Sequence, residues 1–101
     1  MAKKPKIPKL LKLCLDGMSS KQKYALAGNP SLNIHIQNVL SRDADEWVRR
    51  NLASNPSVTA GIQLILARDY NWTIRLALNN NPSVTKEAKE LLRNNKISYY
   101  T

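Results

Sequence analysis

The 101-residue sequence has one cysteine, one histidine, three glycines and no phenylalanine. A single thiol, Cys14, excludes an intramolecular disulfide, and with only one histidine it also excludes a conventional zinc site of cysteine and histidine ligands. The scarcity of cysteine favours a reducing, cytoplasmic setting. Because the chain has the usual size of one domain, a large multidomain enzyme is excluded as well.

Long hydrophobic runs are also missing. Lys9 and Lys12 interrupt the leucine-rich stretch near the N-terminus, so this stretch lacks the continuous apolar segment of a secretory signal. The spacing of Leu10, Leu13 and Cys14 is i, i+3, i+4, which predicts that they form the buried face of an amphipathic first helix. Binding of this helix to a membrane surface is the alternative.

Acidic residues are scarce relative to basic ones. The chain has 16 Lys and Arg against 7 Asp and Glu, a formal net charge of +9. Residues 1–28 hold seven Lys and one Asp, a net +6, so the remainder contributes +3. This balance indicates a polyanionic partner. Hydrophobic content of 43% and charged content of 23% are ordinary for globular proteins, which argues against overall disorder and against a membrane span.

What the sequence does contain is an internal repeat. The tripeptide Asn-Pro-Ser begins at Asn29, Asn55 and Asn81, at intervals of 26 residues. Aligning 29–54 with 55–80 without a gap gives identity at 10 of 26 positions. The same register extends backwards, so we expect a single α-helical repeat domain over residues 1–101, in copies 3–28, 29–54, 55–80 and 81–101.

Each copy is predicted to form a pair of short helices. Apolar residues at i, i+3, i+4 predict a first helix near 8–16, 34–42, 60–68 and 86–94, in which Leu40, Leu66 and Leu92 are equivalent and buried. A second helix is predicted near 20–28, 46–54 and 72–80. Side chains that can accept a hydrogen bond from a helix N-terminus precede these segments: Ser19, Asn33, Asp45, Thr59, Asn71 and Thr85. Helices this short must stack on neighbouring copies to be stable, which predicts an all-α, short right-handed α-solenoid of about 3.5 helix-pair repeats.

The sequence resembles a known family at Asp43-(x)4-Val48-Arg49-(x)2-Leu52-Ala53-(x)-Asn55-Pro56 and at the matching positions from Asp69 to Leu78. This pattern is similar to that of the leucine-rich-repeat-variant (LRV) family and of the wider HEAT-like class. The resemblance covers roughly residues 17–85 and implies an α-helical superhelix. It implies no particular function, because such folds have many roles. The cysteine cluster that holds an iron–sulfur centre in one branch of the family is absent, so neither a metal nor a cofactor is expected.

Repeated cations are the sharpest candidate for a binding site. Lys23, Arg49 and Arg75 share one column of the alignment, and a stacked row of cations is suited to tracking phosphates. The alternative, implied by the HEAT-like resemblance, is that Arg49 and Arg75 pair with the repeated Asp residues in a structural ladder. The predicted contact residues for nucleic acid or another partner are Lys3, Lys4, Lys6, Lys9, Lys21, Lys23, Arg49, Arg50 and Arg75.

No pattern of a catalytic site is found in the sequence. His35 aligns with Gly61 and Glu87 and has no second histidine or cysteine as a chemical partner, so the chain is not expected to be an enzyme. Trp47 and Trp72 fall in adjacent columns and are interpreted either as partly buried residues or as anchors for stacking on a base or a partner protein.

Two functions remain open at this point. The favoured one is a non-catalytic basic module that binds the backbone of DNA or RNA through its phosphates, without reading sequence. The alternative is a protein–protein interaction adaptor or a small inhibitor protein, whose partner would have an acidic surface.

Overall fold

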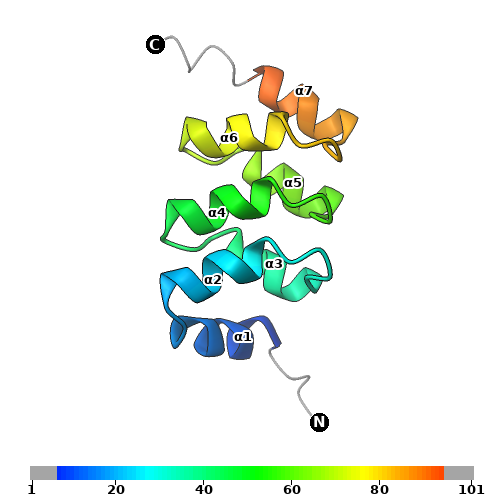
Figure 1. The fold of residues 1–101 in the computed structure, drawn as a ribbon. Coiled ribbons are helices and arrows are strands. Elements are labelled where there is room, and N and C mark those ends of the chain that lie inside the picture. Colours follow the sequence, from blue (N-terminus) through cyan, green and yellow to red (C-terminus); the bar gives the residue numbers. More distant parts are fainter. Residues whose placement is uncertain (1–6, 95–101) are drawn as a thin grey trace.

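The computed structural model describes residues 7–94 of the chain. This range contains seven α-helices and no β-strand, which confirms the all-α class for the described residues. The helices, shown in Figure 1, are α1 (Ile7–Asp16), α2 (Ser20–Ala27), α3 (Ile34–Leu40), α4 (Glu46–Ala53), α5 (Ala60–Leu66), α6 (Trp72–Asn79) and α7 (Lys86–Asn94).

The helices lie close to the predicted segments, and the main difference is at two C-terminal ends. Helices α3 and α5 end at Leu40 and Leu66, two residues earlier than predicted. After each of them the backbone tightens, because the N–H groups of Arg42 and Arg68 donate to carbonyls three residues back, at 3.1 Å in both cases. The chain therefore turns into the next helix sooner than the hydrophobic pattern indicates.

Side-chain caps account for most of the helix starts. Ser19, Asn33, Asp45 and Asn71 each accept a hydrogen bond from a backbone N–H of the first turn, as predicted. The prediction for Thr59 was wrong. Its side chain forms no cap bond, and its Oγ1 is buried without a partner among the described residues.

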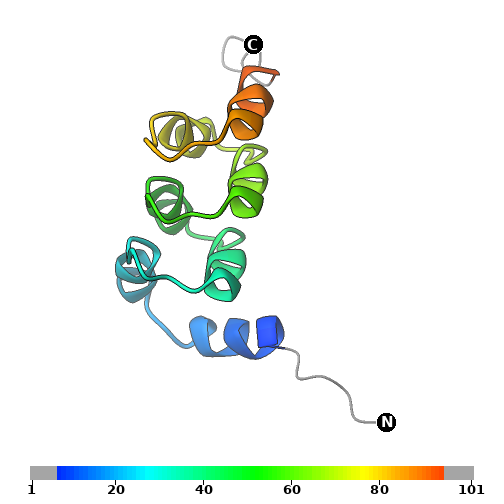
Figure 2. The same ribbon diagram turned by 90° about the vertical axis from the view of Figure 1, so that its right-hand side faces the viewer.

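Figure 2 shows the helices in two layers, seen from the side. Helices α2, α4 and α6 form one layer, in which α4 packs against both neighbours, and α3, α5 and α7 form the other. Helix α1 packs against α3 at the N-terminal end. Segments that lie one repeat apart in the sequence are therefore adjacent in space.

The core lies between the two layers. Leu40 and Leu66 are completely buried and Leu92 is 4% exposed, which confirms that these equivalent leucines share one environment. Leu52 and Leu78 meet them from the other layer and are also completely buried. Deleting one such side chain would remove contacts from two layers at once.

The predicted buried face of α1 was wrong. Leu10 is 56% exposed, Leu13 is 63% exposed and Cys14 is also exposed, whereas Leu15 is buried. In α3 and α5 the column of Leu10, Leu13 and Cys14 is covered by neighbouring helices, but α1 is the first of the described helices and packs against α3 on its other side. Leu15 lies instead on the side that faces α3 and is covered by it.

The recurring Asn-Pro-Ser tripeptides connect one repeat to the next. Asn55 Nδ2 donates to the carbonyls of Ala27 and Asn29, both at 2.9 Å, and its Oδ1 accepts from the Ser57 N–H at 2.9 Å. Asn81 makes the equivalent bonds to Ala53, Asn55 and Ser83 at 2.8–3.0 Å. Both asparagines are nearly inaccessible, and each gives the carbonyl of Ala27 or Ala53 a donor from the following repeat. The carbonyls of Asn29 and Asn55 also accept from the N–H groups of Leu32 and Val58.

A second buried amide performs the same task in the other layer. Gln37 Nε2 donates to the carbonyl of Leu32 in its own repeat, at 3.0 Å, and to that of Ser57 in the next, at 3.2 Å. Its Oε1 accepts from the Thr59 N–H at 3.0 Å, which explains how the start of α5 is held without a threonine cap. Gln63 repeats this arrangement with Val58, Ser83 and Thr85.

Candidate interaction surface

Two of the repeated cations form buried ion pairs between successive repeats. Lys23 Nζ lies 2.8 Å from Asp43 Oδ2, and Arg49 Nε lies 2.8 Å from Asp69 Oδ2. The side chains of the second pair are only 5% and 6% exposed. In both pairs the cation of one copy meets the aspartate of the following copy, so the bond ties adjacent repeats together.

The surroundings of Arg49 keep it charged. Burial alone would lower the pKa of its guanidinium, but the hydrogen bond and the charge of Asp69 outweigh this and raise the pKa above its ordinary value. Arg49 Nη1 also donates to the Asp43 carbonyl at 2.6 Å, and the Tyr70 ring lies 5.2 Å from its guanidinium carbon. Its donors are therefore engaged inside the protein.

The two aspartates have a second structural role. Asp43 Oδ1 accepts from the N–H of Asp45, and Asp69 Oδ1 accepts from the N–H of Asn71, both at 2.9 Å. Each carboxylate thus holds the residue that caps the next helix while it neutralises a cation of the preceding repeat. We call the four residues Lys23, Asp43, Arg49 and Asp69 the inner charge row.

The structure does not present every predicted contact residue at the surface. Arg49 and Arg75 are 4% and 7% exposed, and Arg75 Nη1 donates to the Asp69 carbonyl. Both arginines are therefore buried, not exposed as contact residues would be. Arg49 pairs with Asp69 as in the ladder alternative, whereas the bond from Arg75 to Asp69 is to a backbone carbonyl. Lys23 is half-buried and paired with Asp43.

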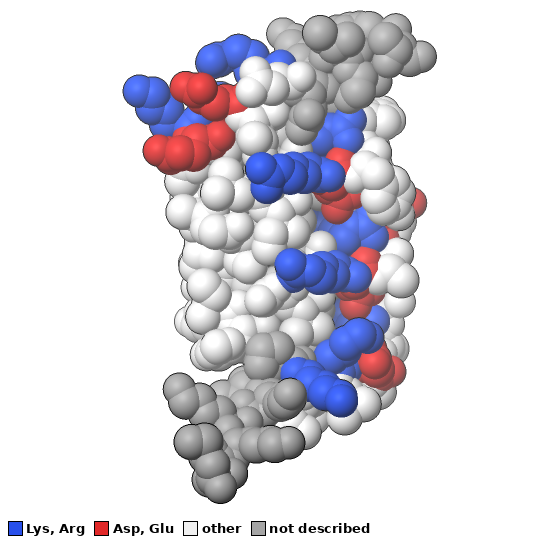
Figure 3. Space-filling model, turned by 180° about the vertical axis from the view of Figure 1, so that it is seen from behind, with Lys and Arg blue, Asp and Glu red and all other residues white. Residues whose placement is uncertain are grey.

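The other predicted contact residues differ in position. Lys9, Lys21 and Arg50 are exposed, whereas Lys3, Lys4 and Lys6 lie outside the described residues. Figure 3 shows cations and anions alternating along one edge of the molecule, next to a broad area without charge. On this face the described cations do not merge into one continuous positive surface.

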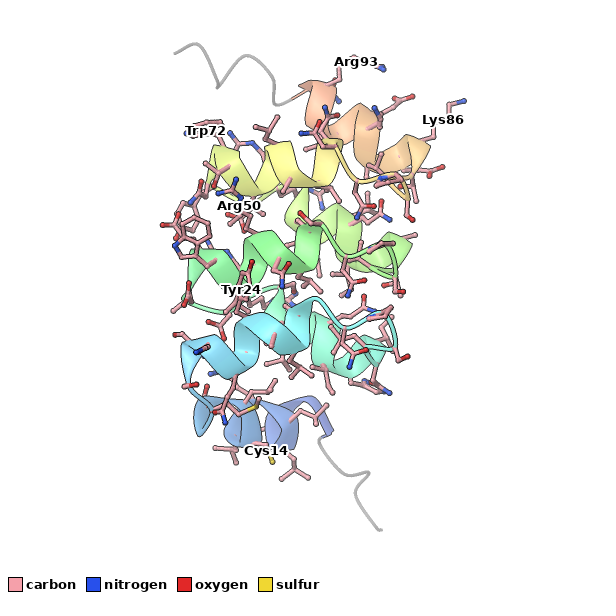
Figure 4. The ribbon with its side chains drawn as sticks, in the orientation of Figure 1. Cys14, Tyr24, Arg50, Trp72, Lys86 and Arg93 are labelled. Atoms are coloured by element: carbon pink, nitrogen blue, oxygen red, sulfur yellow. The ribbon has the colours of Figure 1, made fainter. Side chains whose placement is uncertain are left out.

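A different surface combines aromatic residues with an arginine. Five large side chains are exposed on the layer of α2, α4 and α6, and we call them the aromatic face: Tyr24, Trp47, Arg50, Trp72 and Leu76. The two tryptophans are 56% and 57% exposed. Figure 4 shows Tyr24, Arg50 and Trp72 projecting from three successive helices of this layer.

Local contacts order the aromatic face. The guanidinium of Arg50 lies 5.1 Å from the ring of Trp47, a cation–π arrangement that holds both side chains against the same helix. A groove of about 240 Å³ runs between α4 and α6 and is lined by Arg50, Thr73, Leu76 and Asn80 among others. Lys21 on α2 and Glu46 on α4 are also exposed in this layer, so together with Arg50 its described helices expose two cations and one anion.

The 26-residue spacing of the sequence also indicates this face. Tyr24, Arg50 and Leu76 are 26 residues apart, directly after the three residues of the cation column. A large exposed side chain therefore recurs beside each buried or half-buried cation. Leu76 was not predicted to belong to any surface.

A larger cavity lies between α1 and the corner that joins α3 to α4. Its volume is about 610 Å³, and its lining includes the apolar side chains of Leu15 and Val39. The charged residues in the lining are Lys9, Lys12, Asp16, Lys23, Arg42 and Asp43. Lys12 and Lys23 are paired with the two aspartates, whereas Lys9 and Arg42 have no carboxylate partner within residues 7–94.

The residues considered as candidates for catalysis or metal binding do not form a chemical site within residues 7–94. His35 is exposed, and within residues 7–94 no group of three or more His, Cys, Asp or Glu side chains is placed to hold a metal ion. Asp45 accepts a hydrogen bond from the Trp47 N–H at 2.8 Å, which lowers the pKa of its carboxyl. None of the helices described has the length and apolar character needed to span a bilayer.

No protein-family model matches the chain, and the searches of curated proteins and of solved structures found no match.

Proposed function

We propose that the chain is a short right-handed α-solenoid of about 3.5 helix-pair units of 26 residues, related to the LRV and HEAT-like repeats. The support is the recurrence of the same contacts at the same spacing. Asn55 and Asn81 each bond to a carbonyl 28 residues earlier and to another 26 residues earlier. Gln37 and Gln63 each reach 20 residues forward, to Ser57 and Ser83.

Deletion of one unit tests this architecture. Removing residues 55–80 joins Ser54 to Asn81 and leaves every remaining Asn-Pro-Ser turn in register. We expect this variant to unfold cooperatively in urea with a lower free energy of unfolding, because stacked repeats contribute nearly additively. Removing residues 61–80 breaks the register and should abolish cooperative unfolding. Equal behaviour of the two deletions would contradict the repeat architecture.

We further propose that this module is not an enzyme and that it binds a protein partner through the aromatic face. The observation that carries this proposal is the joint exposure of Trp47, Arg50 and Trp72, while Lys23 and Arg49 are neutralised within the protein. Tryptophan, tyrosine and arginine are the residues that contribute most to binding at protein interfaces. A surface that exposes two tryptophans beside an arginine is better suited to a folded partner than to a phosphate chain.

The test compares matched baits. The intact chain and the double variant Arg50→Ala/Trp72→Ala are immobilised beside a control, Lys86→Ala/Lys89→Ala, that removes two exposed cations from α7. After nuclease treatment, a protein held by the intact chain and by the control, and lost with the double variant, would support the proposal. Equal retention of the same protein by all three baits would contradict the role of the aromatic face.

Nucleic acid is the second candidate partner, and a specific observation favours it. The cavity beside α1 contains Lys9 and Arg42, two cations without a carboxylate partner within the described range. The four lysines at positions 3, 4, 6 and 9 are also close together in the sequence. Cations arranged in this way would bind phosphates without recognising bases.

Salt dependence separates the two candidates. Binding of a fluorescent 30-nucleotide single strand and of a 30-base-pair duplex is measured by anisotropy at about 20 mM and 200 mM salt. Phosphate binding predicts affinity that falls by roughly a hundredfold or more across this range and falls further in Lys9→Ala/Arg42→Ala. No binding at low salt would exclude this second function and leave the protein partner as the proposal.

A further inference from the structure

Helix α1 exposes an apolar face that the other helices of its layer bury. Leu10, Leu13 and Cys14 occupy the columns of Ile36, Val39 and Leu40 in α3. The three α3 residues are half-buried or completely buried, whereas those of α1 are all exposed. An exposed stripe of this kind is unfavourable in water and indicates a surface that another helix covers.

The opposite end of the stack has a different character. Gln37 in α3 and Gln63 in α5 face the following repeat, and both are buried. The equivalent residue in α7 is Lys89, which is exposed. Arg93 occupies the next turn of the same face and is exposed as well. In a head-to-tail dimer, Lys89 and Arg93 of one copy would lie against the α1 leucines of the other copy and beside its Lys9. The two cations would lose water, and they would repel Lys9, so this arrangement is unfavourable.

The charges around the apolar stripe favour a second copy of the same face. The centre of Leu10, Leu13 and Cys14 along the helix lies between residues 12 and 13. If a twofold axis passes through this point, two copies of α1 run antiparallel, and residue 9 of one copy lies opposite residue 16 of the other. In an antiparallel helix pair the same flanks of the two helices face each other. Lys9 and Asp16 lie on one flank of the stripe, and both are exposed. Asp16 already holds Lys12 of its own helix at 3.2 Å, and this pair is exposed, so each Lys9 would join the pair from the other copy.

We propose that the chain forms a head-to-head dimer in which α1 packs antiparallel against α1 of a second copy. Leu13 lies nearest the twofold axis and meets its equivalent, and two Lys9–Asp16 pairs close the flanks. An interface formed mainly by two ten-residue helices is small, so the dimer is weak and dissociates in the micromolar range or above. Both aromatic faces remain exposed in this dimer, which makes it a bivalent version of the binding module.

Sedimentation velocity of the full chain under reducing conditions tests the proposal, at concentrations from about 1 to 500 μM. The intact chain should change from monomer to dimer with concentration. Leu13→Glu places two carboxylates at the axis and should raise the dissociation constant by about a hundredfold or more. Because Leu13 is 63% exposed, this variant should fold normally, and Leu76→Glu, on the aromatic face, is the matched control that leaves dimerisation intact.

Charge reversal distinguishes the antiparallel arrangement from other contacts. Lys9→Asp replaces two attractive pairs with two repulsive ones and should weaken the dimer by about tenfold. Adding Asp16→Lys to this variant restores opposite charges and should recover the original affinity. Failure of the second substitution to rescue the first would overturn the proposed geometry.

Cys14 supplies an independent readout, because it is the only thiol in the chain and lies on the proposed interface. Its alkylation by iodoacetamide should slow as the protein concentration rises, and it should stay fast in Leu13→Glu. A monomer at every concentration would overturn the dimer. Binding of such a monomer to vesicles of phosphatidylglycerol, lost in Leu13→Glu, would assign the α1 face to a lipid surface instead.

Discussion

Arg49 and Arg50 are adjacent in the sequence and have opposite environments. Arg49 points between the repeats, where it is 4% exposed and bonded to Asp69. Arg50 points outward beside Trp47, at the edge of a shallow groove. Two residues of the same type on one helix thus belong to the inner charge row and to the aromatic face, respectively.

The comparison teaches that the position of a cation within the repeat decides its role. The net charge of +9 suggests a surface made for polyanions, but part of this charge is used inside the stack. On folding, the Arg49 guanidinium loses its contact with water and bonds to a carboxylate and to backbone carbonyls instead. These bonds contribute to the contact between repeats. Within the part of the chain that the structure describes, the Arg50 guanidinium contacts the Trp47 ring and leaves its N–H donors for a partner.

The largest effect is expected from Arg49→Met. The substitution leaves Asp69 buried without its cation, which should lower the free energy of unfolding by about 3–5 kcal/mol. Arg50→Met removes an exposed side chain and should cost no more than about 0.5 kcal/mol. Urea denaturation monitored by circular dichroism measures both. Similar losses in the two variants would break the distinction between the inner charge row and the aromatic face.

The next effect concerns two leucines. Leu66→Ala removes a completely buried side chain and should cost about 2–5 kcal/mol, because the cavity collapses only in part. Leu76→Ala, at a position that is 42% exposed, should cost less than about 1 kcal/mol. The same urea denaturation applies, and a Leu66→Ala variant as stable as the parent would show that the core is misplaced.

A smaller loss is expected from Asn55→Ala. It removes the donor to the Ala27 carbonyl and one of the two donors to the Asn29 carbonyl, which should cost about 1–3 kcal/mol. Asn80→Ala at the exposed end of α6 is the control and should change stability by less than about 0.5 kcal/mol. Hydrogen exchange should also speed up at Ser57, whose N–H loses its acceptor. Unchanged protection there would contradict the connecting role of Asn55.

The smallest effect concerns acid stability at the start of α4. The pKa of Asp45 is lowered from 3.8, chiefly by the Trp47 N–H, so its cap contributes stability above pH 3.8 and loses it as the pH falls below that value. Asp45→Ala should cost about 1 kcal/mol at pH 7. Asp45→Asn keeps an acceptor that does not titrate, so its deficit relative to the parent should shrink between pH 5 and pH 3. A constant deficit in urea denaturation across this range would contradict the assigned cap.

Much of the fold followed from local patterns in the sequence. The spacing of Leu40, Leu66 and Leu92, together with caps such as Asn33 and Asn71, is set within one short segment, so helix positions could be predicted closely. The environment of α1 could not be predicted in this way. Its leucines have the same spacing as those of α3, but burial depends on whether a neighbouring helix is present, which periodicity does not encode.

The contacts between repeats were predicted less well than the helices. Asn55 and Gln37 were recognised as repeated residues, but their bonds reach 20 to 28 residues along the chain, and their donors and acceptors are visible only in three dimensions. For Arg49, sequence analysis left a phosphate contact and a structural ladder open. Only the position of Asp69 in the following repeat decides where that arginine points. The exposure of Trp47 and Trp72 likewise depended on packing.

A double-mutant cycle between residues 49 and 69 tests the central claim most directly. Free energies of unfolding are measured for the parent, Arg49→Met, Asp69→Asn and the double variant, and a second cycle combines Arg50→Met with Asp69→Asn. The structure predicts a coupling energy of about 1–3 kcal/mol in the first cycle and a value within about 0.5 kcal/mol of zero in the second. A coupling near zero in the first cycle, or equal couplings in both, would contradict the assignment of Arg49 to the interior and of Arg50 to the surface.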